Sequence, residues 1–393
     1  MISSRAELLS HLARKGTLAG ERLDGVSLDG VTLAGVDLSG TRWERSHARG
    51  ADLRGADLGG ASLRGVDLAG ADLRGALLKG ADLGGARLGA AKLEGACLAG
   101  ARLAGVDLAQ QDLRGLDFTF ADLSGANLRK SDLGLASLGR ASLASACLDE
   151  ASLDGTDLTE ADLSGATLRG ARVHRAQMSG CLLGRADLRE ARVLKAVMVG
   201  VDLRTTLLTG GSLVQTLLEG VNAAGADLSR CDLTNSMLLG ADLTGAKLVE
   251  AIAVQTSFAG ATLRKARLTR LTGLRANLDG AVLDEADLSG ASLVDASLER
   301  ASLQGACADR AALPNARLGQ ADLRRALLRE ADLRNVDLSH ARLEGADLRG
   351  ARLGRANLHR TRLQEANLAD ADLGGARPTD PERARAEDFR PKA

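Results

Sequence analysis

The sequence contains very few of the residues that normally fill an irregular protein core. Aromatic residues make up 1% of the 393-residue chain, tyrosine is absent, and there are four prolines. Bulky aromatic side chains usually fill the uneven spaces of a large core. A chain that relies on leucine and alanine instead must have small, regular spaces to fill. This argues against the two or three globular domains that the length alone would favour.

An excess of charge of one sign is also missing. The 51 Lys and Arg residues balance the 51 Asp and Glu residues, so the formal net charge is zero. Such a protein has no overall field to draw it to DNA or to an anionic membrane. The aromatic side chains that stack on single-stranded bases are missing as well. We therefore expect neither direct nucleic-acid binding nor membrane binding.

The cysteines follow no pattern that indicates a disulfide framework or a zinc site. They are odd in number, widely spaced and without a C-x-x-C pair: Cys97, Cys147, Cys181, Cys231 and Cys307. We interpret them as reduced thiols. The first residues, MISSRAELLSHLARKG, lack the unbroken apolar core of a signal peptide, and no stretch approaches the ~20 apolar residues of a membrane span. The sequence therefore predicts a cytoplasmic protein without a cofactor.

A five-residue repeat runs through nearly the whole chain. Between Ala51 and Gly75 the quintets read ADLRG, ADLGG, ASLRG, VDLAG and ADLRG. If the third residue of each quintet is called the centre, centres recur from Leu18 to Leu373 in 72 quintets without insertion or deletion. Leucine occupies 60 centres, and alanine stands two residues before the centre in 47 quintets.

A period of five fits neither a helix nor a flat strand. On a helix, five residues advance about 500°, so successive leucines would lie about 140° apart and form no stripe. On a strand, an odd period would send alternate leucines to opposite faces. The chain must therefore turn a corner in every quintet. Stacked coils would then bury the centres and the small residues in one continuous core.

The repeated A-(D/N)-L-x-x pattern resembles the pentapeptide-repeat family over residues 16–375. The resemblance implies an all-β fold, a right-handed quadrilateral parallel β-helix with four quintets in each coil. The chain would then form about 18 coils and a rod roughly 85 Å long, at ~4.8 Å per coil.

We divide the chain into three segments. Residues 1–15 are expected to hold a capping helix over 4–15, because Ser4 to Glu7 has the form of a capping box and Gly16 follows Lys15. Residues 16–375 form the β-helix. Residues 376–393 are charged and contain proline, which predicts a flexible tail, with packing of Phe389 on the last coil as the alternative.

A few centres lack a large apolar side chain, and we expect weak points there: Ala48, Ala223, Ala253, Gly273 and Ala308. Around Gly273 the order Leu271-Thr272-Gly273-Leu274 places a leucine out of phase. We interpret this quintet as a tolerated defect or a bulge, with a functional hinge as the alternative.

The sequence indicates no catalytic or metal site. A wall of stacked coils with a Leu and Ala interior offers no concave, water-poor site. His340 and His359 lie about one coil apart on the same side, but no third ligand is evident. The many aspartates belong to the repeat itself. We therefore expect a protein that is not an enzyme.

Sorting the quintets by their place in a twenty-residue coil assigns them to four sides, which begin at Leu18, Leu23, Leu28 and Leu33. The net charges of sides one to four are −4, 0, −1 and +2. Some members of the resembled family protect DNA gyrase or topoisomerase from inhibitors, and surface carboxylates that imitate DNA are the proposed basis. DNA carries one charge per ~1.7 Å, so no side here has enough carboxylates for strong mimicry. Gyrase or topoisomerase protection remains the alternative function.

Apolar residues gather at outward positions of sides one and four in the middle of the chain. They are Leu194, Val197, Val199, Val214, Leu217, Met237, Leu239, Ile252 and Val254. A contiguous exposed apolar patch usually marks an interface, although local packing over the corners is the simpler alternative. The leading hypothesis is a protein-interaction scaffold whose patch contacts a protein partner or forms a homodimer.

Overall fold

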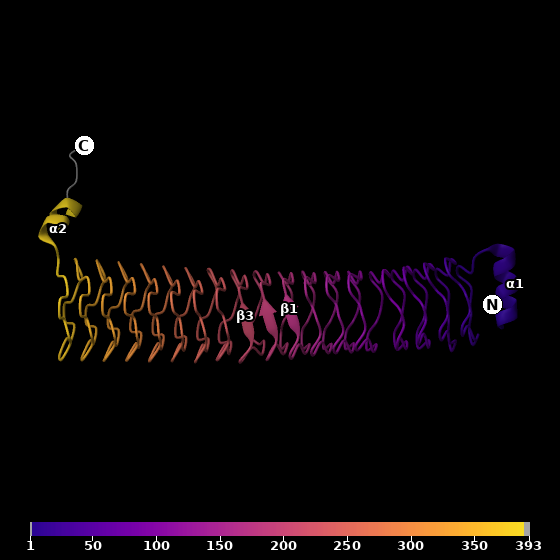
Figure 1. Cartoon of the computed structure of the whole chain (residues 1–393), viewed down its shortest axis with the longest axis horizontal. Coiled ribbons are helices and arrows are strands. Elements are labelled where there is room, and N and C mark those ends of the chain that lie inside the picture. The colour runs from indigo at the N-terminus through magenta and orange to yellow at the C-terminus, as the bar shows by residue number, and fades with distance from the viewer. Residues whose placement is uncertain (1, 389–393) are drawn as a thin grey trace, which may run out of the picture. The chain divides into compact units, whose positions relative to one another are not determined.

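The computed structural model describes residues 2–388 and forms two compact units. The N-terminal unit comprises the residues up to 201 together with 205–207, and the C-terminal unit comprises 202–204 and the residues from 208 onward. Each unit is a stack of coils without long helices (Figure 1). No helix within residues 2–388 has the length and apolar character to cross a bilayer.

Parallel β-bridges join residues that are twenty apart in the sequence. Asp52 bridges to Asp72 in the N-terminal unit, and Ile252 bridges to Thr272 in the C-terminal unit. Four quintets therefore complete one coil, and each coil pairs with the next. Within the described part of the chain, three pieces are long enough to count as strands: β1 (Arg172–His174) and β2 (Arg192–Leu194), which pair in parallel, and β3 (Ser212–Val214).

The backbone of each quintet bonds mostly to the neighbouring coils. In quintet 56–60, the Leu58 N–H donates to the Leu77 carbonyl at 2.7 Å and the Gly60 N–H donates to the Lys79 carbonyl at 2.9 Å. The same pattern recurs along both units. Because the bonds run between coils, each coil depends on its neighbours for its backbone pairing.

The residue after each centre does not donate to this ladder. Where an aspartate precedes the centre, its side chain accepts that N–H instead, as Asp57 Oδ1 does from Gly59 at 2.9 Å. This explains why aspartate recurs in the repeat. It also explains why the one proline inside the repeats, Pro314, stands after a centre, because that position needs no N–H for the ladder.

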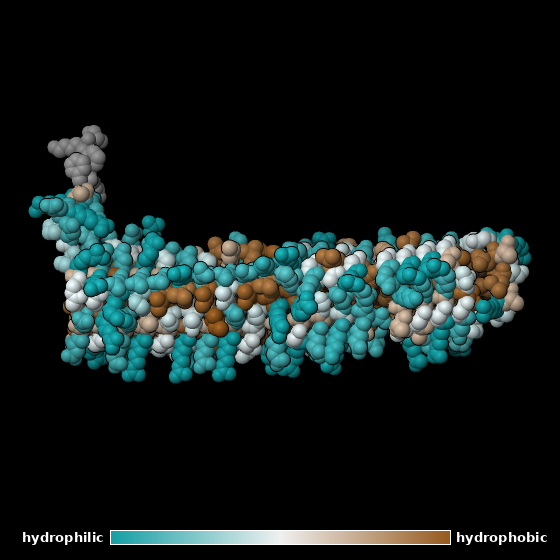
Figure 2. Space-filling model, viewed as in Figure 1, coloured by the Kyte–Doolittle hydropathy of each residue, from teal (hydrophilic) through white to brown (hydrophobic). Residues whose placement is uncertain are grey.

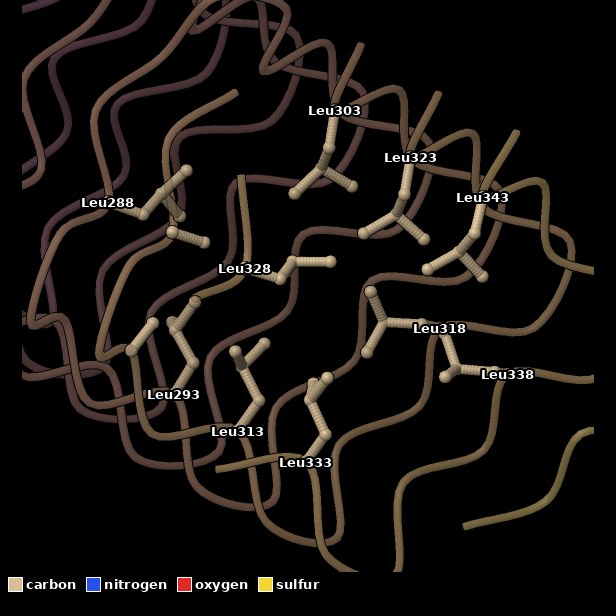
Figure 3. Close-up of a pocket in the computed structure, with 12 residues that line it drawn as sticks. Leu288, Leu293, Leu303, Leu313, Leu318, Leu323, Leu328, Leu333, Leu338 and Leu343 are labelled. Carbon is tan, nitrogen blue, oxygen red and sulfur yellow. The ribbon is translucent and has the colours of Figure 1, made fainter. Parts of the chain in front are cut away.

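Leucine side chains from the sides of each coil meet inside the stack. Figure 3 shows labelled leucines of the C-terminal unit pointing toward one another, among them Leu293, Leu313 and Leu328. A cavity of about 10 Å³ lies among these leucines beside Ala308, and its lining is entirely leucine and alanine. A water molecule there would find no polar partner. This cavity is therefore expected to be dry.

The first coil is covered by α1 (Arg5–Lys15). Ser4 caps this helix by accepting the Glu7 N–H at 3.2 Å, and Gly16 ends it in the left-handed conformation with φ 71°. Ile2 and Leu8 are buried at 2% and 0% exposure. The leucines of the first coil are consequently shielded from water.

Within residues 2–388, nothing covers the last coil as α1 covers the first. A short helix, α2 (Pro381–Asp388), stands in the segment for which the sequence predicts a charged, flexible tail. Asp380 caps α2 by accepting N–H groups of Glu382 at 2.9 Å and Arg383 at 3.2 Å, and proline fits the first turn. Phe389 lies outside the described residues.

α2 contacts residues along the side of the last coils rather than their open end (Figure 1). As a result, Leu363 and Leu368 are only half-buried, and Leu373 is 41% exposed. The two ends of the repeat region therefore differ, because the first coil is shielded and the last coil presents part of its interior to water.

The irregular quintet at Gly273 keeps the ladder of its neighbours. Thr272 bridges to Ser292 as usual, so the predicted bulge is absent. Leu271 is buried at the position that alanine normally holds. A Cβ on Gly273 would lie 2.8 Å from Leu293 Cδ2 and 3.0 Å from Leu271 Cδ2. The quintet has thus exchanged its large and small inward residues.

Candidate functional site

Side four of the C-terminal unit forms one wall of the stack. Its outward residues change from uncharged to charged along the stacking direction. Each quintet presents two outward residues, directly before and directly after its centre, and a corner residue two after the centre. On side four these lie, for example, at 272, 274 and 275. Corner residues of side three, such as 270, form the opposite edge of the same wall.

Outside this section, several coils of side four carry an ion pair between their two outward residues. In the N-terminal unit, Arg74 Nη2 lies 2.6 Å from Asp72 Oδ2, and hydrogen bonding from Arg74 lowers the pKa of Asp72 to about 2. In the C-terminal unit, Arg334 Nη2 lies 2.5 Å from Asp332 Oδ2. Such pairs keep the wall hydrated and give a partner little apolar area to bury.

Between these charged coils, four successive coils of the C-terminal unit carry no charged outward residue on side four. We call their residues the uncharged strip: Ile252, Val254, Thr272, Leu274, Ser292, Val294, Ala312 and Pro314. Bridges stack Ile252 on Thr272, Thr272 on Ser292, and Ser292 on Ala312. Ile252 is 42% exposed and Leu274 is 38% exposed.

Figure 2 shows hydrophobic side chains on the face of the C-terminal unit that is in view, with rows of hydrophilic side chains beside them. Exposed apolar side chains also lie elsewhere, among them Leu77, Phe120 and Leu135 of the N-terminal unit.

The predicted patch divides between the two units. In the N-terminal unit, Leu194 and Val197 are half-buried and Val199 is 36% exposed. In the C-terminal unit, three members are half-buried, namely Val214, Leu217 and Val254, and three are exposed, namely Met237 (52%), Leu239 (37%) and Ile252 (42%). The bridge between Leu217 and Met237 brings those two together on side one.

Side four carries further apolar residues outside the predicted patch. Leu274, Val294 and Pro314 follow Val254 at intervals of twenty residues and occupy the same outward position on successive coils. The twenty-residue spacing was a sufficient signal to find them in the sequence. With these residues, the apolar surface of side four centres on residues 252–314.

The edge of the strip toward side one carries one pair of opposite charges. Arg275 Nε lies 3.8 Å from Asp295 Oδ2, and Asn315 donates to Asp295 Oδ1 at 2.9 Å. Gln255 is the corner residue of the coil before Arg275. This edge therefore carries charged residues next to the midpoint of the strip and neutral polar residues one coil farther from it.

The edge toward side three carries alternating charges. Arg230 Nε lies 3.0 Å from Glu250 Oε2, Arg270 Nη1 lies 3.5 Å from Glu250 Oε1, and Arg310 Nε lies 2.9 Å from Glu330 Oε2. Hydrogen bonds from their arginines lower the pKa values of Glu250 and Glu330. The carboxylates thus stay ionised at neutral pH, and both signs of charge border the strip.

A second cluster joins α2 to the last coils. His340 Nε2 and His359 Nε2 each lie 3.3 Å from Glu387 Oε2, and the three ligand atoms fall within 4.8 Å of one another. Glu387 is the third potential ligand that the sequence did not reveal. Its position depends on the fold of the segment after the repeats.

The donors around Glu387 do not fit a metal ion. The Asp380 N–H donates to His359 Nδ1 at 3.1 Å, so the neutral ring carries its proton on Nε2, the atom that would have to bind the metal. Arg360 Nε lies 3.2 Å from the same carboxylate oxygen. We therefore assign the cluster to holding α2 in place. Desolvation opposes ionisation of Glu387, but hydrogen bonds from His359 and Arg383 outweigh it and lower its pKa.

A family model described as Pentapeptide repeats matches most of the chain. The matched residues are 27–65, 56–95, 67–103, 101–140, 136–175, 212–248, 240–271, 276–313, 313–350 and 341–377. No curated protein matches the sequence.

Several solved structures are similar. A trypsin-treated M102R form of QnrB1, a plasmid-mediated fluoroquinolone resistance protein, is 19% identical, with 49% of this chain and 93% of that chain covered and a TM-score of 0.36. HetL, a pentapeptide-repeat protein involved in heterocyst differentiation regulation from the cyanobacterium Nostoc sp. strain PCC 7120, is 25% identical, with 96% and 98% covered and a TM-score of 0.16. Rfr23 from the cyanobacterium Cyanothece 51142 is 25% identical, with 43% and 88% covered and a TM-score of 0.13. All three TM-scores are below 0.5.

Proposed function

Because the chain belongs to the pentapeptide-repeat family, we propose that it is a non-enzymatic interaction scaffold that binds a protein partner through a side wall. The observation that carries the proposal is the uncharged strip, where four coils in succession carry no charged outward residue on side four. The proposal includes a right-handed β-helix of about 18 coils and a cytoplasmic location, where the five cysteines would stay reduced.

The free-energy cost of covering a wall with a partner differs between charged and uncharged walls. A partner that covers Asp72 and Arg74 must desolvate an ion pair, which offsets much of the gain from contact. A partner that covers Val254 and Leu274 removes apolar surface from water, which is favourable by about 25 cal/mol per Å². Association is therefore expected at the strip rather than at the ion-paired walls.

The alternative function, protection of gyrase or topoisomerase by DNA mimicry, requires rows of free carboxylates. The wall carboxylates named above are paired with arginines, as Asp72 is with Arg74 and Asp332 with Arg334. This pairing favours the scaffold over the mimic. Capture of gyrase or topoisomerase is one outcome of the experiment described next.

The test is affinity capture from the lysate of the native host with three baits. These are the wild type, a strip variant with Val254→Asp and Leu274→Asp, and a control variant with Thr244→Asp and Thr262→Asp on side two. The proposal expects one protein to be captured by the wild type and the control and lost with the strip variant. Equal capture of gyrase or topoisomerase subunits by all three baits would instead support the alternative, and capture of no specific protein would contradict both.

A further inference from the structure

We propose that the uncharged strip binds the same strip on a second copy of this chain, with the two C-terminal units antiparallel. The inference rests on the proposed function, because it names the partner of the same surface. Its basis is the distribution of apolar and charged residues about the midpoint of the strip. Isologous contacts of this kind require a surface that complements itself.

The midpoint of the strip lies between the coil of Leu274 and the coil of Val294. A two-fold axis that runs across the wall at this point, perpendicular to the stacking direction, reverses the order of the coils and keeps each edge against the same edge. Leu274 then faces the second copy's Val294, and Val254 faces the second copy's Pro314. Apolar side chains therefore meet apolar side chains along the whole outward column.

The edge toward side one matches under the same operation. Arg275 faces the second copy's Asp295, and Asp295 faces the second copy's Arg275, so two pairs of opposite charges form. In the next coils outward, Gln255 faces Asn315, and two amides can exchange hydrogen bonds. The midpoint was fixed by the apolar residues, so the agreement of the charges is an independent observation.

The edge toward side three also matches. Glu250 faces the second copy's Arg310, and Arg230 faces the second copy's Glu330, while Arg270 faces the second copy's Gly290. These pairings place no two like charges opposite each other on this edge. Complementary edges fix the register of an interface and disfavour other arrangements.

The parallel arrangement of the same two strips is disfavoured. A two-fold axis along the stacking direction would bring opposite edges together and place Arg275 against the second copy's Arg270. The antiparallel arrangement has one like-charged pair, Asp232 facing Asp332, at the end of the contact. Arg334 lies 2.5 Å from Asp332 on the same chain and compensates that pair.

The size of the contact predicts a weak dimer. The six coils from Asp232 to Asp332 extend over about 29 Å, and a wall about 15 Å wide would bury about 900 Å² over both copies. This is below the roughly 1,000 Å² of a stable interface, so we expect a weak, transient dimer and set its dissociation constant in the micromolar range for the test. The described contacts of α2 involve His340, His359 and Arg360 of side one, so this helix leaves the strip accessible.

The test measures self-association of the full chain by sedimentation velocity at about 1 to 500 µM, which spans the expected range. The wild type should form dimers with rising concentration. Arg275→Glu and Asp295→Arg should each weaken dimerisation by about tenfold, because each places like charges opposite each other twice. The control Arg325→Glu reverses a corner charge outside both edges and should dimerise like the wild type.

The decisive measurement uses an equimolar mixture of the Arg275→Glu and Asp295→Arg variants. In the mixed dimer, the glutamate introduced at position 275 of one variant would face the arginine introduced at position 295 of the other. The Asp295 that remains in the Arg275→Glu variant would face the Arg275 that remains in the Asp295→Arg variant. Dimerisation should therefore return to the wild-type level. The mixture does not repair the ion pair within either chain, so recovery reports on the contact between copies.

Two results would overturn the inference. One is a wild type that stays monomeric throughout the concentration range, and the other is a mixture that dimerises no better than its components. Loss of a captured partner by the Val254→Asp/Leu274→Asp variant would still support the proposed function in either case.

Discussion

Single residues adapt the repeat wherever a centre departs from leucine. Trp43 fills one centre, and its indole Nε1 donates to the buried Thr41 hydroxyl at 2.8 Å, which in turn donates to the Leu38 carbonyl at 2.6 Å. At Gly273 the adaptation is one of volume, because Leu271 occupies the space that a central leucine would need. The inward pair of a quintet therefore behaves as a unit whose total volume matters more than its order.

If the total inward volume of a quintet decides its stability, a larger residue at Gly273 should be tolerated only when Leu271 is made smaller. Gly273→Leu should lower the free energy of unfolding by about 1 to 3 kcal/mol, because the new side chain overlaps Leu271 and Leu293. Adding Leu271→Ala restores the usual order of alanine and leucine, and the double variant should recover most of the loss. Urea denaturation of the wild type, both single variants and the double variant measures the coupling. Additive losses in the double variant would contradict the exchange of volume.

The cysteines differ in their expected reactivity. Burial raises the pKa values of the Cys181 and Cys231 thiols to about 12, and both side chains are almost inaccessible. Since the thiolate is the reactive form, these two should resist iodoacetamide at about pH 8 in the folded protein, whereas the half-buried Cys97, Cys147 and Cys307 should react faster. Mass spectrometry of the labelled peptides would show the difference. Equal labelling of all five in the folded state would contradict it.

Among the elements, α1 and the last coil offer a direct comparison. Leu8 of α1 is fully buried over the first coil, whereas Leu373 of the last coil is 41% exposed. Leu8→Asp should therefore destabilise the N-terminal unit by about 3 kcal/mol or more, and Leu373→Asp should cost less than about 1 kcal/mol. Hydrogen exchange of the first and last coils, together with urea denaturation, measures both effects. Similar costs for the two variants would show that the last coil is covered in solution.

The position of α2 should depend on Glu387. Its pKa is lowered in the folded state, so its contribution is complete above its unfolded pKa of about 4.3 and is lost as the pH falls through the folded value. Glu387→Gln should raise amide exchange of residues 381–388 at neutral pH. The wild type should show the same increase only below about pH 4. Exchange that is identical in both proteins at neutral pH would refute this role.

For the whole molecule, the five-residue period was enough to predict the repeat region and its inward residues, because every quintet repeats the same local chemistry. The α2 helix was missed because its proline and charges are also typical of a tail, and its contacts with His359 and Arg360 are distant in sequence. The sequence constrains the candidate patch less strongly. Its residues lie on walls, where burial does not constrain the sequence, and the separation into two units is not visible in the repeat pattern.

The walls of both units should share one response to acid. Asp72, Asp202, Asp332 and Asp347 all have lowered pKa values, chiefly because of hydrogen bonds from the arginines two residues later. Each contributes stability above its unfolded pKa of about 3.9 that is lost as the pH falls through its folded value. The midpoint of urea denaturation should stay constant from about pH 7 to about pH 4.5 and fall steeply below about pH 4. A midpoint that changes evenly from neutral pH downward would contradict this.

The twenty-residue spacing of the bridges has a consequence for how such a gene can change in length. Loss or duplication of twenty codons would remove or add one coil and leave every later side chain on its original wall. A change of five codons would preserve the inward leucines but rotate all later residues by a quarter turn, so that Ile252 and Val254 would no longer share a wall with residues upstream of the change. Folding should therefore tolerate insertions or deletions of five residues. A binding surface that extends over both sides of the change is kept only when the change is a multiple of twenty residues.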